Sequence, residues 1–186
     1  MSIKIVHSGV IPYYLHNNTY YLFLSEEKDD IKKWCGFTGR RDPGEDLITT
    51  ASREGWEESM GLLGNINVLK HRIKNANYAI FSVNGDKASV QYLIKCDKYC
   101  YDTLQDNFNN VIDYLEHCNG KCSIFSNGCY EKVKGKWIKL PDIMDAAVNK
   151  TTIKGTDGFI RPLFDTSLIN GTLIKDPSVD MFSKYL

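Results

Sequence analysis

The sequence has no excess of charge of either sign: its 186 residues carry 23 lysines and arginines and 23 aspartates and glutamates. A chain without net charge produces no global field toward nucleic acid or an anionic membrane, so any anion binding must come from a local patch. The sequence also lacks the run of roughly 20 apolar residues that a membrane-spanning helix needs. Low-complexity tracts and internal repeats are absent as well. What is left is an ordinary globular chain, long enough to bury a core in one domain.

The N-terminal stretch MSIKIVHSGVIPYYL has polar residues every few positions and no small-residue cleavage site, so it predicts a strand and a cytoplasmic protein. Because no secretion signal is expected, the six cysteines do not predict a disulfide framework. The pairs Cys96/Cys100 and Cys118/Cys122 are spaced more widely than in most zinc knuckles. We expect reduced, partly buried thiols.

Hydrophobic patterning predicts a hairpin from residues 3–15 and 19–25. It predicts three further strands, in the stretches INVLKHRI, YAIFSV and SVQYLIKC. Between the hairpin and the first helix, the glycine-punctuated stretch IKKWCGFTGRRDPGE predicts a loop. A last short strand is expected at KWIKL.

Helices are expected from about Asp46 to Met60, over residues 103–117, and after the last strand, with Pro141 near its start. These elements predict an α/β or α+β fold in which helices lie against a mixed sheet. We expect a single domain over residues 1–186, with a helical insertion at about 97–130. Because long connections in compact domains tend to be functional, substrate specificity is expected there.

Glu54, Glu57 and Glu58 lie at positions i, i+3 and i+4 of the first predicted helix, so their carboxylates share one face. Like charges at this spacing destabilise a helix by only about 0.2–0.5 kcal/mol per pair, so one interpretation is an acidic helix face exposed to water. The other is a divalent metal, because oxygen-only ligands suit Mg²⁺ or Mn²⁺ together with a substrate's phosphates. The loop before the helix carries Arg40 and Arg41, the type of cation that neutralises phosphate oxygens.

Gly39, Glu45, Arg53-Glu54 and Glu57-Glu58 follow one another with gaps of five, seven and two residues. This spacing resembles the Nudix box, the signature of the Nudix hydrolases, and six such matches have chance odds on the order of one in a hundred thousand. The stretches WCGFTG and YEKVKGKWIKLPDI resemble further parts of that family. The resemblance extends over about residues 3–150 and implies a Nudix-type α/β/α sandwich with a mixed β-sheet. We call residues 39–58 the box segment.

The resemblance also implies roles for the charged residues of the box segment. Glu57 and Glu58 would be the main metal ligands, and Glu54 would be either a ligand or the general base for the attacking water. Arg53 would orient these carboxylates through salt bridges, together with Glu45.

Three positions depart from the family pattern. Thr38 replaces a glycine, and its backbone carbonyl would take over as a metal ligand. Gly55 replaces an aliphatic residue, which costs about 1 kcal/mol in a helix relative to alanine. Met60 replaces a glycine, with Gly61 one position late. No charged residue is lost, and we expect Gly55 with Ala51 to let the helix approach the sheet closely.

Residues outside the box segment are weaker candidates. Glu131 resembles a late catalytic glutamate of the family, although a surface carboxylate is the commoner role and other acids compete with it (Asp97, Asp102, Glu116). Trp34 would stack on a nucleobase, an interaction of about 1–3 kcal/mol, although aromatic residues more commonly pack in the core; the same applies to Tyr13, Tyr14 and Phe81. His71 and Arg72 would touch a substrate or lie on an exposed strand edge.

The implied activity is that of a Nudix pyrophosphohydrolase that uses Mg²⁺ or Mn²⁺. Water attacks phosphorus in a phosphoanhydride, most typically a nucleoside diphosphate linked to another group, and the protein supplies charge neutralisation and alignment. The partner would be a nucleotide or another small diphosphate. Neutral net charge and the absence of a basic arm argue against capped RNA, but a local patch of Arg40, Arg41, His71 and Arg72 keeps it as a possible partner. A homodimer is left open.

The alternative is a catalytically weak module of the same fold that binds a nucleotide, capped RNA or a protein partner. Retention of every box glutamate favours the enzyme, whereas the departures at Thr38 and Met60 favour the module. The sequence does not choose among the diphosphate substrates.

Overall fold

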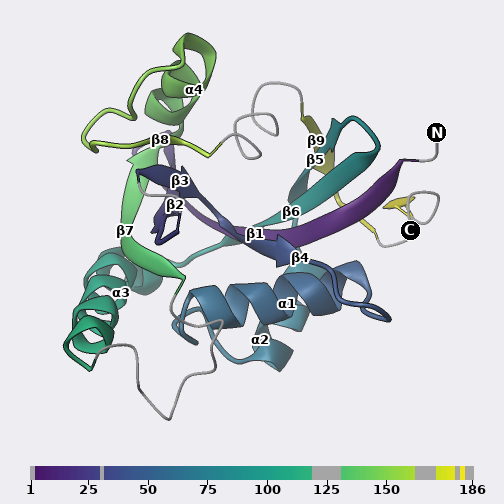
Figure 1. Cartoon of the computed structure of the whole chain (residues 1–186), viewed down its shortest axis with the longest axis horizontal. Helices are drawn as coiled ribbons and strands as arrows, with labels where there is room; N and C mark the ends of the chain where they lie inside the picture. The colour runs from purple at the N-terminus through teal and green to yellow at the C-terminus, as the bar shows by residue number, and fades with distance from the viewer. Residues whose placement is uncertain (1–2, 30–31, 119–130, 162–170, 179–180, 183–186) are drawn as a thin grey trace.

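The structure is a computed structural model, and it describes residues 3–29, 32–118, 131–161, 171–178 and 181–182. Its centre is one strongly curved mixed sheet with helices on both faces (Figure 1). The predicted α/β class with a mixed β-sheet is therefore confirmed. None of the described helices is long and apolar enough to cross a membrane.

The described part of the chain forms nine strands and four helices, whose bounds are: β1 Lys4–His16, β2 Thr19–Glu27, β3 Lys33–Cys35, β4 Phe37–Arg40, α1 Leu47–Glu58, α2 Ile66–Lys74, β5 Tyr78–Asn84, β6 Lys87–Lys95, α3 Lys98–His117, β7 Lys132–Lys139, α4 Leu140–Asn149, β8 Phe159–Ile160 and β9 Thr172–Lys175. The main strand order is β8-β3-β2-β1-β6-β5-β9, with β4 paired to β1 and β7 paired to β2. Strands β1 and β6 run parallel, and the β1–β2 hairpin turns through Asn17 and Asn18, both at positive φ. Asparagine tolerates that conformation, so the predicted turn has a local cause.

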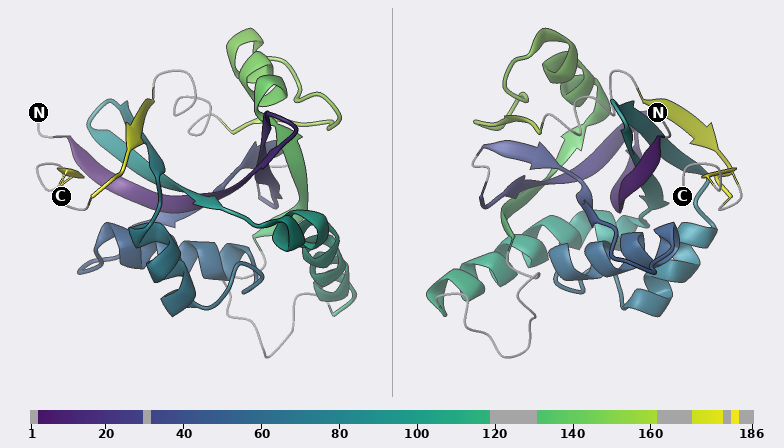
Figure 2. Two further views of the ribbon diagram at one scale, coloured as in Figure 1. Left: turned by 180° about the vertical axis from the view of Figure 1, so that it is seen from behind. Right: turned by 45° about the vertical axis from the view of Figure 1, so that its right-hand side comes forward.

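The helices divide the core in two. Figure 2 shows α1, α2 and α3 on one face of the sheet and α4 on the other. Under the first three lies a cluster that includes Phe23, Phe37 and Phe108. The second cluster lies on the α4 side and includes Trp34 and Ile143. Both faces of the sheet are thus covered, as in a three-layer sandwich.

Helix α1 begins as predicted, because the Asp46 side chain accepts a hydrogen bond of 2.6 Å from the Thr49 amide. It ends at Glu58, two residues before the predicted end. Met60 and Gly61 then take φ values of +55° and +77°. Met60 thus adopts a left-handed conformation at the position where the family pattern has glycine, at a cost of about 1–2 kcal/mol.

Gly55 lies directly against the sheet. A Cβ atom added there would lie 2.9 Å from Cγ2 of Val10 in β1. The close approach expected from Gly55 is therefore present, and it explains why a residue with low helix propensity stands inside α1.

The strand predicted at INVLKHRI is wrong: these residues form the helix α2. Asn65 caps it by accepting a hydrogen bond from the Val68 amide, and Leu69 and Ile73 form a buried i, i+4 pair. The β-branched residues of the stretch suggested a strand, but the cap and the packing of α2 against α1 favour the helix.

His71 and Arg72 therefore lie on a helix and not on a strand edge. Arg72 donates to the carbonyl oxygens of Leu63 (3.0 Å) and Lys95 (2.9 Å), which is a structural role. The loop predicted before α1 contains the short strands β3 and β4.

Helix α3 begins earlier than predicted, at Lys98, because Asp97 caps it. The remainder of the predicted insertion, residues 119–130, lies outside the described residues, as do Cys122 and Cys129. The cysteines that are described, Cys35, Cys96, Cys100 and Cys118, are free, in line with the expected reduced thiols.

Helix α3 also protects the edge of the sheet at β7. The side chain of Asn109 accepts a hydrogen bond from the Gly135 amide (2.8 Å) and donates to the Gly135 carbonyl (3.2 Å). Gln105 accepts one from the Trp137 amide (3.0 Å). The two amide side chains thus take the place of a neighbouring strand on this edge, which prevents edge-to-edge pairing with another chain.

We expect Gly55→Leu to lower the free energy of unfolding by about 1–3 kcal/mol, because the new side chain has to push α1 away from Val10. Urea denaturation followed by circular dichroism measures the change. Full stability in this variant would contradict the close packing of α1 on the sheet.

We expect Asn109→Ala to lower the free energy of unfolding by about 1–3 kcal/mol, since it leaves a buried backbone amide without its acceptor. Asn110→Ala, an exposed position one residue along the same helix, is the matched control and should change it little. The same denaturation experiment compares the two, and equal stabilities would show that the α3 amides do not protect the edge.

Candidate active site

Arg53 is the centre of the box segment. Its guanidinium contacts Glu45 (Nε to Oε1, 3.1 Å), Glu54 (Nη1 to Oε1, 2.6 Å) and Glu57 (Nη1 to Oε2, 3.0 Å). Its Nη2 atom also donates to the backbone carbonyl of Arg40 at the end of β4 (3.0 Å). One side chain therefore joins two carboxylates of α1 to the loop that precedes the helix.

Gly39 is required by the position of Glu54. A Cβ atom at Gly39 would lie 2.2 Å from the Glu54 carboxylate, so any side chain there would displace it. The glycine of the box segment thus gives the carboxylate room against β4. Its function is spatial, and no unusual backbone angle is involved.

Glu58 points into the protein and is 3% exposed. Its Oε2 atom accepts a hydrogen bond from the Thr38 amide (2.7 Å), and its Oε1 atom lies 3.0 Å from Nζ of Lys132. Lys132 is itself buried and also contacts Glu27 (2.7 Å). Glu27 in turn pairs with Arg161 at 2.8 Å. A chain of charged groups therefore runs from α1 through β7 and β2 to the residue that follows β8.

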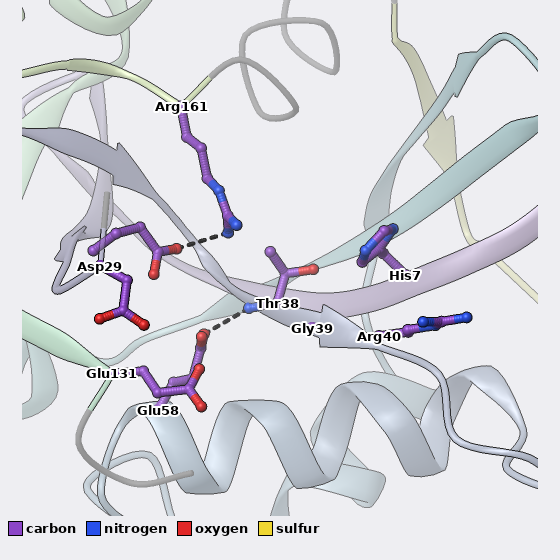
Figure 3. A pocket seen from close by; sticks show the side chains of 9 residues that line it. His7, Asp29, Thr38, Gly39, Arg40, Glu58, Glu131 and Arg161 are labelled. Carbon is purple, nitrogen blue, oxygen red and sulfur yellow. Dashed lines mark hydrogen bonds and ion pairs between the residues drawn. The ribbon is translucent and has the colours of Figure 1, made fainter. Parts of the chain in front are cut away.

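These side chains border a cavity of about 240 Å³, which Figure 3 shows at close range. Its lining contains five of the residues named from the sequence, Thr38, Gly39, Arg40, Glu58 and Glu131. It also contains four residues that the sequence analysis did not single out: His7, Glu27, Asp29 and Arg161. Glu54 and Glu57 are not part of the lining. Glu54 nevertheless lies directly beside the cavity, because it contacts Gly39 and Arg53.

Two residues predicted to bind substrate lie elsewhere. Trp34 is 1% exposed and packs in the core on the α4 side, where a Cβ atom at Gly158 would meet its indole ring at 2.4 Å. Its ring is therefore buried, and it also forms part of the lining of a second cavity, with Lys134 and Asp157. Arg41 does not belong to the cavity lining, and its amide bonds to the Val6 carbonyl (2.9 Å).

The residues missed from the sequence carried no local signal. Lys132 directly follows Glu131 and alternates with other lysines along β7, so nothing in the stretch KVKGK marks one lysine as buried. Glu27 ends a strand, as surface glutamates often do. Arg161 and His7 belong to no motif, and only the folded sheet brings them to the cavity.

Burial dominates the electrostatics of the acids. It raises the pKa of Glu54 to about 7, against the attraction of Arg53 and with support from the neighbouring Glu57. It raises the pKa of Glu58 to about 8, against the attraction of Lys132. Burial acts on Glu27 in the same direction, but Lys132, a hydrogen bond from the Cys35 thiol and Arg161 outweigh it, and its pKa is lowered. The two acids that share Lys132 thus differ, since Glu27 has the Cys35 thiol and Arg161 as further partners.

The donor chemistry of this region fits a hard divalent cation, because the fold gathers more carboxylate than its own cations stabilise, and all the donors are oxygens. In the described part of the chain, however, no three acidic, histidine or cysteine side chains stand together as a ready metal site. The reason lies in the pairing: Arg53 holds Glu54 and Glu57, while Lys132 and the Thr38 amide hold Glu58.

Comparison with known proteins gives structural likeness alone. No family model matches the chain, and no curated protein matches it. Among solved structures, the chain is similar to an Ap4A hydrolase from C. elegans in a binary complex, with 20% identity, a TM-score of 0.44, and coverage of 76% of this chain and 85% of that one. A second structure of C. elegans Ap4A hydrolase gives 20% identity, a TM-score of 0.42, and coverage of 78% and 86%. Both similarities are too low to assign a family or a substrate.

We expect the affinity for Mn²⁺ to rise as the pH goes from about 6 to about 8.5, because protons compete with the metal for carboxylates. The direction follows from the raised pKa values of Glu54, about 7, and Glu58, about 8: below these values the protonated acid is a poor ligand. Calorimetric titration of Mn²⁺ across this range measures the effect. An affinity that does not change with pH would show that these acids do not bind the metal.

Proposed function

We propose that this protein is a metal-dependent hydrolase of phosphoanhydrides, of the Nudix type, with a nucleotide or another small diphosphate as substrate. One observation carries the proposal: the glutamates of the box segment gather around Arg53 and Gly39 at the edge of a cavity that contains Glu58, Glu131 and Arg40. An acidic helix face with no function beyond solubility does not account for a glutamate at 3% exposure that is held by an amide and a buried lysine.

The site residues would have different roles, according to where they lie. Glu54, Glu57 and Glu58, with the backbone carbonyl of Thr38, would hold Mg²⁺ or Mn²⁺. The bound ion would supply charge neutralisation to the phosphate oxygens. Arg53 would keep the carboxylates in reach of the cavity, and Arg40 would bind phosphate.

The reaction is a displacement at phosphorus. The oxygen of a water molecule bonds to one phosphorus, the bridging P–O bond breaks, and the departing phosphate takes its electron pair. The proton of the water passes to a carboxylate, for which Glu54 and Glu131 are the two candidates because both lie beside the cavity lining or in it. Alignment of water and phosphate supplies the remaining part of the catalysis.

A second candidate is a module of the same fold that binds a nucleotide, capped RNA or a protein partner without turnover. The observation that favours it is the absence of a ready three-ligand group in the described residues, where Arg53 already occupies two of the acids. Thr38 and Met60 at glycine positions favour it too. The two candidates make different predictions for turnover.

We expect orthophosphate or nucleotide release from at least one member of a panel of diphosphate substrates, in the presence of Mg²⁺ or Mn²⁺. Glu57→Gln should lower kcat/KM by about 100-fold or more, because it removes a charged ligand. Asp113→Asn, at an exposed position on α3, is the matched control and should retain full activity.

The measurement is a phosphate-release assay, with circular dichroism to establish that each variant is folded. Turnover that is equal in the wild type and Glu57→Gln would contradict the metal site. A folded protein that binds nucleotide and turns over no substrate of the panel would favour the binding module.

A further inference from the structure

The cavity has two walls of opposite charge. Figure 3 shows Asp29, Glu58 and Glu131 on one side, and His7 and Arg40 on the other. Arg161 reaches in between them and pairs with Glu27. We call His7, Arg40 and Arg161 the cationic wall. They come from β1, from the end of β4 and from the residue after β8, so three separate segments build this wall.

Two of the three residues of the cationic wall have no anionic partner in the described part of the chain. No hydrogen bond or ion pair joins the side chain of His7 or of Arg40 to another residue in the described part of the chain. The charges that act on His7 are those of Arg161, Lys87 and Arg40, and all of them are positive; together with burial they lower its pKa. His7 is therefore a neutral hydrogen-bonding group at neutral pH, set among cations.

Such an arrangement favours an anionic ligand. Three positive residues act on His7, and its partial burial reduces the screening of their charges by water. The chain as a whole carries no net charge, so the attraction for an anion here comes from these residues and not from a global field. An anion placed between His7 and Arg40 would be attracted by the positive charges and accept hydrogen bonds from both.

We expect the acidic wall to bind a different part of the substrate from the part that the cationic wall binds. If the attacked anhydride is held at the carboxylates, as the proposed function states, its phosphates are neutralised there by the metal. The cationic wall then lies beyond the anhydride and meets whatever group the substrate carries next. A neutral sugar at that place would leave the charge of Arg40 without a partner.

We propose that the cationic wall binds a further phosphate of the substrate, so that the preferred substrates are nucleotides with a chain of three or more phosphates. This inference rests on the proposed function and names its substrate class. Arg40 and His7 are the residues that would determine specificity, and Arg161 supports them from its pair with Glu27.

The test compares two substrates that differ in this group, ATP and ADP-glucose, in the wild type and in Arg40→Gln. We expect the wild type to prefer ATP in kcat/KM. Arg40→Gln should lower kcat/KM for ATP by about tenfold or more, the effect of losing one charge-assisted contact, and lower that for ADP-glucose by a clearly smaller factor. Lys74→Gln, which removes one positive charge from the exposed face of α2, is the control and should leave both values unchanged.

A binding measurement separates the wall from the chemistry. In metal-free buffer, we expect inorganic tripolyphosphate to bind the wild type more tightly than pyrophosphate, and Arg40→Gln to remove that difference. His7→Gln keeps a neutral hydrogen-bonding group and should retain more of the difference than His7→Leu. Calorimetric titration gives the dissociation constants.

The outcomes are distinguishable. An equal loss for ATP and ADP-glucose in Arg40→Gln would show that the wall binds the anhydride itself, which overturns the substrate class and leaves the hydrolase intact. A wild type that prefers ADP-glucose overturns it as well. If no substrate is turned over but tripolyphosphate binding depends on Arg40, the hydrolase fails and the anion-binding wall stands.

Discussion

The contacts of Arg53 are the interaction on which the site depends. Three glutamates, Glu45, Glu54 and Glu57, approach one guanidinium, and the same group holds the end of β4 through the Arg40 carbonyl. Without a cation at this point, the carboxylates of α1 would repel one another and turn toward water. Arg53 therefore keeps them together at the edge of the cavity, and it does so with a planar group that reaches several acceptors at once.

A second cation repeats this arrangement inside the protein. Lys132 joins Glu58 of α1 to Glu27 of β2, and it is 1% exposed. A buried ion pair is weak evidence for stability, because removal of the charges from water offsets most of their attraction. Its effect here is on position: it holds the Glu58 carboxylate inside the protein and connects α1 to β7 and β2. Loss of either partner would leave a charge buried and unpaired.

The two cations explain why a site so rich in acids can fold before any ligand arrives. Arg53 and Lys132 each take two or more carboxylates, and burial raises the pKa of Glu54 and Glu58, so that protons can neutralise what the cations leave. A ligand with positive charge would replace those protons. On the opposite wall, His7 and Arg40 lack an anionic partner among the described residues. The cavity thus presents one wall that favours a cation and one that favours an anion.

Short-range sequence patterns predicted those parts of the fold that depend on residues close together in the chain. The turn at Asn17 and Asn18, the cap at Asp46 and the face shared by Glu54, Glu57 and Glu58 each depend on residues within one turn of chain. The stretch INVLKHRI shows the limit: its β-branched residues predict a strand, while a single capping asparagine and the contact with α1 decide for a helix. Trp34 shows it too, since its burial depends on Gly158, which lies far along the chain.

The spacing of the box residues, and with it the common face of three carboxylates, is a property of the sequence alone, because helix geometry converts spacing into direction. The partners of those carboxylates cannot be derived from the sequence alone. Lys132, Arg161 and His7 are separated from the box segment by long stretches of chain. Only the pairing of β7 with β2, of β8 with β3 and of β4 with β1 brings them to the cavity or beside it. The sequence determined which acids face the same way. The tertiary structure decided which of them are paired and where the opposing charges stand, because sheet register and helix docking, and not residue spacing, set those distances.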